Sequence, residues 1–156
     1  EKHISLNKKH IINNNIKFSP IAVSNEEKLV EFSNDVNYRD GNTYIIGSYI
    51  FAAAANKIMV QCQSIDGLIE QGFEKPGIIK IDVEGAEYDV LVGAKNTLQQ
   101  YKPNILLATH DCHLPGVQKK CVTFLTELGY YLQHTGRHNK HMAGLDDYIA
   151  IHKSIL

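Results

Sequence analysis

The stretch IIKIDVEGAEYDVLVGAKNTLQQYKPNILLATHDCH, residues 78–113, decides the fold. Its β-branched start, residues 78–81, predicts a short strand. The next segment, residues 84–100, has the apolar spacing of a helix, and the Lys-Pro pair that follows ends this helix. A second apolar run, residues 105–108, predicts another strand. The stretch therefore predicts a strand–helix–strand unit.

Ionisable residues follow both predicted strands. Asp82 and Glu84 come after the first strand, and His110 and Asp111 come after the second. In an open parallel sheet, ligands bind outside the carboxyl ends of the strands. The sequence therefore predicts a functional site that starts from these four residues.

The rest of the chain alternates strand and helix patterns, which predicts an α/β fold with a mostly parallel sheet. The last two strands follow each other without a helix, so we expect an antiparallel C-terminal hairpin. Residues 29–32 are expected to form a hairpin with the strand before them. Residues 1–12 have a weak helical pattern, and residues 33–56 are expected to form a long polar loop. Strands are predicted at residues 16–23, 29–32, 58–63, 130–135 and 148–152, and helices at residues 65–71 and 117–128.

The composition is that of an ordinary globular protein, and the 156 residues predict a single domain. The net charge of −1 argues against non-specific electrostatic binding to nucleic acid or anionic lipid. No apolar run approaches the roughly 20 residues that cross a bilayer. The three cysteines lack CxxC spacing, which indicates reduced thiols and predicts a cytoplasmic protein.

The segment KIDVEGAE, residues 80–87, is followed by Leu91, Gly93 and Ala94 in the helix pattern. This combination resembles the signature of the FkbM-type methyltransferases, which belong to the class I S-adenosylmethionine-dependent superfamily. Three flanking segments are similar to the same family: IKFSPIAVS, SIDGL and KPNILL, at residues 16–24, 64–68 and 102–107.

The resemblance implies a Rossmann-like class I methyltransferase sheet and S-adenosylmethionine as the cofactor. It also implies methylation of a hydroxyl on a sugar, a glycan or a secondary metabolite. The superfamily's Gly-rich turn after the first strand is not found in this sequence. We therefore expect a partial domain that lacks the N-terminal cofactor-binding strands, and exposed sheet edges that favour a homodimer. A non-catalytic, methyltransferase-like binding module is the alternative.

Within this resemblance, Asp82, His110 and Asp111 are the predicted catalytic residues, and Asp82 and Glu84 are the predicted cofactor-binding residues. Asp82 can position an acceptor hydroxyl or accept its proton, but it can equally cap the next helix. His110 suits a general base because histidine titrates near neutral pH. Glu84 and Glu87 either compensate the dipole of the next helix or belong to the site, and the sequence leaves both explanations open.

No metal is predicted, although Asp82, Asp111 and a histidine could together ligate a divalent cation. Such a cation would also permit a third function, a metal-dependent hydrolase. His113 could join the site or face solvent. Lys80 is expected to pair with one of the carboxylates. A basic patch that meets an acidic acceptor, or a solvated loop, is expected from His134, Arg137, His138, Lys140 and His141.

Overall fold

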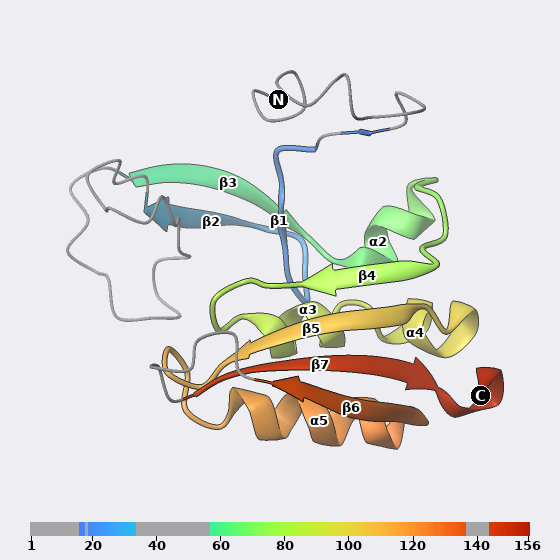
Figure 1. Ribbon diagram of the computed structural model, residues 1–156. Helices are drawn as coiled ribbons and strands as arrows, with labels where there is room; N and C mark the ends of the chain where they lie inside the picture. Colours follow the sequence, from blue (N-terminus) through green and yellow to red (C-terminus); the bar gives the residue numbers. More distant parts are fainter. Residues whose placement is uncertain (1–15, 18, 34–56, 137–143) are drawn as a thin grey trace, which may run out of the picture.

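The computed structural model describes residues 16–17, 19–33, 57–136 and 144–156, and these form a mixed α/β fold (Figure 1). The expectations for residues 1–12 and 34–56 lie outside this described part. The described strands are β1 (Ala22–Val23), β2 (Lys28–Ser33), β3 (Lys57–Gln63), β4 (Ile78–Ile81), β5 (Asn104–His110), β6 (Tyr130–Gly136) and β7 (Leu145–His152). The helices are α2 (Ile65–Glu70), α3 (Glu87–Val92), α4 (Lys95–Tyr101) and α5 (Val117–Glu127), followed by the short 3-10 helix η2 (Lys153–Ile155).

The larger sheet has four strands in the order β4-β5-β7-β6. β6 and β7 pair antiparallel, which confirms the predicted C-terminal hairpin. β7 lies between β5 and β6 and runs against both, so β4 and β5 form the single parallel pair of this sheet in the described residues. The prediction of a mostly parallel sheet is therefore wrong for this part of the chain. Among the same residues β4 lies at an edge of the sheet and pairs with β5 alone.

A smaller sheet has the order β1-β3-β2. β3 pairs parallel with β1 and antiparallel with β2, and Cys62 lies opposite Ala22 on one side and Lys28 on the other. The expected hairpin between the first two strands is wrong, because β3 lies between them. The first strand is also shorter than predicted, since only Ala22–Val23 pair. Pro20, which has no backbone N–H to donate, lies outside the strand.

The single helix predicted for residues 84–100 is two helices, α3 and α4, that meet at Gly93 and Ala94. A Cβ atom on Gly93 would lie 2.0 Å from the backbone oxygen of Ser24, so the chain packs here more closely than any side chain allows. The helix also begins later than predicted, because Glu84 and Gly85 have φ values of 55° and 110°. These values lie outside the helical region.

The core lies between the larger sheet and helices α3, α4 and α5 (Figure 1). Val90, Leu91, Ala94 and Leu98, from the segment with helical spacing, are buried in this core together with Val117, Cys121 and Leu125 of α5. The opposite face of the sheet carries Lys80, Leu106 and Ile149, and 43% of Leu106 is exposed. Within the described residues, no helix is both long and apolar enough to span a bilayer. The buried core consists of Ile81, Val90, Leu91, Ala94, Leu98, Ile105, Leu107, Val117, Cys121, Leu125, Tyr130 and Ala150.

Candidate active site

The connection between β4 and α3 turns sharply at Glu84. Its φ of 55° is rare for a residue with a side chain, and the described residues hold only one other case, Lys102. Lys102 caps the end of α4 in a left-handed conformation that is common at helix ends. Glu84 caps no helix end, and strained residues of this kind concentrate at functional sites. The turn brings the Glu84 carboxylate within 3.1 Å of His113 Nδ1 and 3.4 Å of His110 Nε2.

His110 ends β5, and 4% of its side chain is exposed. Its Nδ1 lies 2.7 Å from Oε1 of Glu87, and the backbone N–H of Gly85 donates to the same oxygen at 2.7 Å. The other ring nitrogen, Nε2, faces the carboxylates of Asp82 and Glu84 at 3.7 and 3.4 Å. Glu87 therefore fixes the orientation of the ring, and this orientation directs Nε2 at the two carboxylates.

The surroundings of His110 favour its charged form. Burial lowers its pKa, but the hydrogen bond and charge of Glu87 raise it, and the charges of Glu84 and Asp82 add to this effect. The net result is a pKa above the ordinary value of about 6.5. The carboxylates around the ring thus outweigh the cost of placing a cation inside the protein.

The structure places Glu87 and His113, whose roles the sequence left open, beside the predicted cluster. Glu87 is fully buried, and its Oε2 has no hydrogen-bond partner within the described residues. The His113 ring stacks on that of His110, with centroids 5.7 Å apart. The sequence left a role of Glu87 in the site open, because acidic residues are common in the first turn of a helix for dipole reasons alone. The burial of Glu87 and its contact with His110 become visible only in the folded chain.

Lys80 lies beside the cluster, and its Nζ is 2.9 Å from Oδ2 of Asp82. This contact confirms the expected pairing with a carboxylate. The hydrogen bond that Lys80 donates to Asp82 raises the pKa of Lys80, whose side chain is 68% exposed. Asp82 therefore presents one oxygen to Lys80 and the other, Oδ1, to His110.

Asp111 lies apart from these contacts although it follows His110 directly. Its carboxylate accepts the backbone N–H of Gln118 at 2.6 Å and that of Gly116 at 3.3 Å. These are free amides at the start of α5, so Asp111 stabilises the beginning of that helix. Of the four residues predicted from the strand ends, the structure brings together Asp82, Glu84 and His110.

The three clustered residues are also chemically suited to hold a cation. Asp82, Glu84 and His110 each offer one ligand atom, and these atoms lie within 4.8 Å of one another. Elsewhere in the described chain, His134 Nε2 pairs with Asp146 Oδ1 at 2.8 Å. The other residues of the expected basic patch lie outside the described part.

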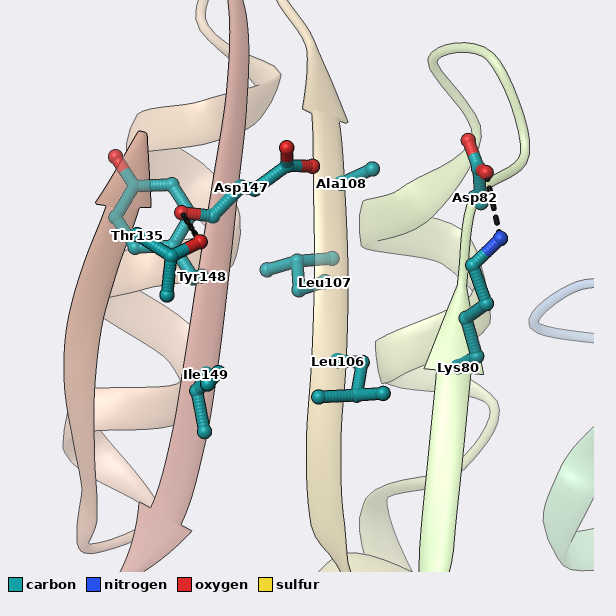
Figure 2. Close-up of a pocket in the computed structure, with 9 residues that line it drawn as sticks. All are labelled: Lys80, Asp82, Leu106, Leu107, Ala108, Thr135, Asp147, Tyr148 and Ile149. Atoms are coloured by element: carbon teal, nitrogen blue, oxygen red, sulfur yellow. Dashed lines mark hydrogen bonds and ion pairs between the residues drawn. The ribbon is translucent and has the colours of Figure 1, made fainter. Parts of the chain in front are cut away.

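A cavity of about 330 Å³ adjoins the cluster on the face of the sheet opposite the helices. Figure 2 shows its lining side chains in front of the strands, with Lys80 on β4, its partner Asp82 directly after β4, and Asp147 on β7. Its volume is at the lower end of the range for small-molecule sites. The cavity is lined by Lys80, Asp82, Leu106, Leu107, Ala108, Thr135, Asp147, Tyr148 and Ile149.

The comparison with protein families finds the methyltransferase FkbM domain over residues 3–141. The chain belongs to the FkbM methyltransferase family. This match confirms the resemblance noted in the segment at residues 80–87. A search of curated proteins gave no significant match.

The fold is similar to that of a solved member of the family. The crystal structure of methyltransferase FkbM from Methylobacillus flagellatus KT matches with a TM-score of 0.63 and 15% sequence identity. The match covers 97% of this chain and 32% of the other, so this chain spans about a third of the length of that protein. At this identity the likeness establishes the fold, whereas the chemistry must be argued from the site itself.

Proposed function

We propose that this FkbM-family chain belongs to an S-adenosylmethionine-dependent O-methyltransferase. Membership of the family supports methyl transfer. The observation that carries the proposal is the meeting of Asp82, Glu84 and His110 at the carboxyl ends of β4 and β5, two adjacent parallel strands. Ligands of open α/β sheets bind at this position.

The charges of the cluster fit a cationic methyl donor. When bound, S-adenosylmethionine supplies a methyl group on a positively charged sulfonium and also carries an ammonium group. The carboxylates of Asp82 and Glu84 would hold these positive groups, because one oxygen of each lies in the same small space beside His110. The residues present therefore fit the donor in charge.

His110 and Asp82 would act on the acceptor. In our proposal they hold the acceptor hydroxyl and take up its proton as the oxygen forms a bond to the methyl carbon and the carbon–sulfur bond breaks. Proton transfer by a positioned side chain contributes about 10²–10⁴-fold to a rate. The remaining advantage would come from holding the reacting atoms in line.

The cavity beside the cluster would receive the acceptor, a small molecule such as a sugar, a glycan or another hydroxylated metabolite. Its walls combine the carboxylates of Asp82 and Asp147 and the hydroxyl of Thr135 with the aliphatic side chains of Leu106 and Ile149. Acceptors of hydrogen bonds next to apolar surface suit a ring that carries several hydroxyls.

The test uses calorimetry with S-adenosylmethionine, followed by an assay for release of S-adenosylhomocysteine with a panel of sugars and glycosides. We expect donor binding that weakens in Asp82→Asn, and turnover that falls about 10²-fold or more in His110→Gln. His134→Gln serves as the control, because it removes a histidine paired with a carboxylate away from the cluster. Donor binding that survives Asp82→Asn and Glu84→Gln unchanged would contradict the proposed site.

A methyltransferase-like binding module is the second candidate. The observation that favours it is that this sequence holds no Gly-rich turn. Calorimetry separates the two functions, since such a module would not bind the donor. The same measurement on a chain extended to the length of the relative would show whether additional residues supply that binding.

A further inference from the structure

We propose that Asp82, Glu84 and His110 form a binding site for one divalent first-row transition cation, with Mn²⁺ as the simplest probe. Two carboxylates and one imidazole give mixed oxygen and nitrogen ligation, which suits Mn²⁺, Fe²⁺ or Zn²⁺. The inference stands apart from methyl transfer, because cation binding can be measured without a methyl donor.

The spacing of the ligand atoms fits a cation placed between them. Bonds of about 2.1 Å to one ion separate its ligand atoms by about 3 Å at right angles and about 4.2 Å across the ion. His110 Nε2 lies 3.4 Å from Glu84 Oε2 and 3.7 Å from Asp82 Oδ1, and all three atoms are within 4.8 Å. Small side-chain adjustments would complete the site.

His110 is oriented as a metal-ligating histidine is. It is almost completely buried, and Nε2 points at two carboxylates. Its Nδ1 is held at 2.7 Å by Glu87. Metal-bound histidines usually contact a carboxylate or carbonyl through their second ring nitrogen in this way, and that contact orients the ligating nitrogen. Glu87 would therefore support the site without touching the cation.

The local charge also favours a cation. Asp82, Glu84 and Glu87 surround one histidine, and Lys80 binds Oδ2 of Asp82, whereas Oδ1 faces His110. A divalent cation would replace the proton of His110 as the partner of these carboxylates. While a cation is bound, Nε2 is a ligand and cannot take the acceptor proton, and Asp82 and Glu84 hold the cation in place of the positive groups of the donor. The acceptor oxygen would then meet the cation, which polarises it.

The experiment titrates the 156-residue chain, stripped with a chelator and dialysed, with Mn²⁺ and follows the paramagnetic resonance signal of the free ion. Mn²⁺ binds protein sites weakly in general, so surface histidines compete little. We expect one bound Mn²⁺ per chain. Asp82→Asn and Glu84→Gly should each weaken this binding about tenfold or more, and glycine suits the positive φ of residue 84. Glu87→Gln should weaken it about 10–100-fold through the orientation of His110.

The matched control is His134→Gln, which removes a histidine–carboxylate pair elsewhere and should leave the affinity unchanged. Circular dichroism confirms that each variant is folded. Three outcomes would overturn the inference: no Mn²⁺ bound at millimolar concentration, binding that both Asp82→Asn and Glu84→Gly retain, or binding lost equally in the control. In each case the proton on His110 would suffice as the counter-charge, and the proposal of methyl transfer would still stand.

Discussion

The contact between Gly93 and Ser24 predicts that Gly93→Ala destabilises the protein. Whether the free energy of unfolding falls or rises in this variant tests the fold. Gly93 has φ −70° and ψ −7°, a conformation that alanine adopts freely. An alanine Cβ at this position would lie 2.0 Å from the Ser24 oxygen and 2.9 Å from both the Ser24 carbonyl carbon and Asn25 Cα. All three are backbone atoms, so no side chain can rotate away. The α3–α4 junction can accept Gly93→Ala only if a backbone segment moves by about 1 Å, which would bring the contact to the 3 Å that real Cβ atoms keep.

Two effects of opposite sign decide the magnitude. Without the contact, Gly93→Ala would stabilise the protein by about 0.4–1 kcal/mol, because alanine restricts the unfolded chain. Overpacking in a closely packed region costs about 1–3 kcal/mol and occasionally more. The overlap is severe and involves backbone, so we place its cost at the upper end, about 3 kcal/mol. The net expectation is a loss of about 2–3 kcal/mol in the free energy of unfolding.

Equilibrium unfolding in urea, followed by circular dichroism, measures this loss. For an m-value of about 2 kcal/mol/M, the midpoint should fall by about 1–1.5 M. Gly77→Ala is the matched control, because a Cβ there meets no atom within 4 Å and the residue has no positive φ. It should leave the midpoint unchanged or raise it slightly. A Gly93→Ala variant as stable as the parent chain would refute the close packing of β1 against the α3–α4 junction.

Three further predictions concern other parts of the chain. Asp66 accepts three hydrogen bonds from the first turn of α4, two of them from Thr97 at 2.8 and 2.6 Å. Asp66→Ala should therefore lower the free energy of unfolding in urea by about 2 kcal/mol. A change near zero would show that Asp66 does not stabilise the start of α4. Burial raises the pKa of Cys121 to about 12, while the unfolded thiol ionises near its ordinary value of about 8.5. Stability should therefore fall as pH rises between these values, by up to about 1.4 kcal/mol per unit, and Cys121→Ala should show a shallower fall. Iodoacetamide should modify Cys112 in the folded chain, as mass spectrometry would show, and should reach the fully buried Cys62 and Cys121 only after unfolding.

The sequence predicted the elements whose signals are local. β4 has the predicted bounds, and α2 begins at the predicted residue 65, directly after Ser64, which accepts the Gly67 N–H at 3.0 Å. The meeting of Asp82 and His110 was also predictable, because the carboxyl ends of neighbouring parallel strands lie at the same edge of a sheet. In these cases a few adjacent residues determine the outcome.

The errors arose where distant parts of the chain decide the structure. The helix break at Gly93 depends on Ser24, which lies far away in sequence, and no periodicity reports such a contact. The place of β3 between β1 and β2 depends on strand pairing across a long connection. The catalytic role of Asp111 stays a prediction, but the contacts of its carboxylate with the free amides at the start of α5 could not be read from the sequence. Sequence position alone cannot show which of two partners a carboxylate takes.

The signature at residues 80–87 joins the fold to the site through several different physical roles. Ile81 is buried in the core and fixes the end of β4. The positive φ of Glu84 reverses the chain, and Gly85 continues that reversal while its N–H binds Glu87. Glu87 in turn holds His110, which belongs to the next strand. A substitution at Gly85 would therefore disturb the orientation of His110 through a backbone amide, without touching any ligand. This coupling gives a physical reason for the motif to act as one unit: the turn that starts α3 also aligns the histidine of β5.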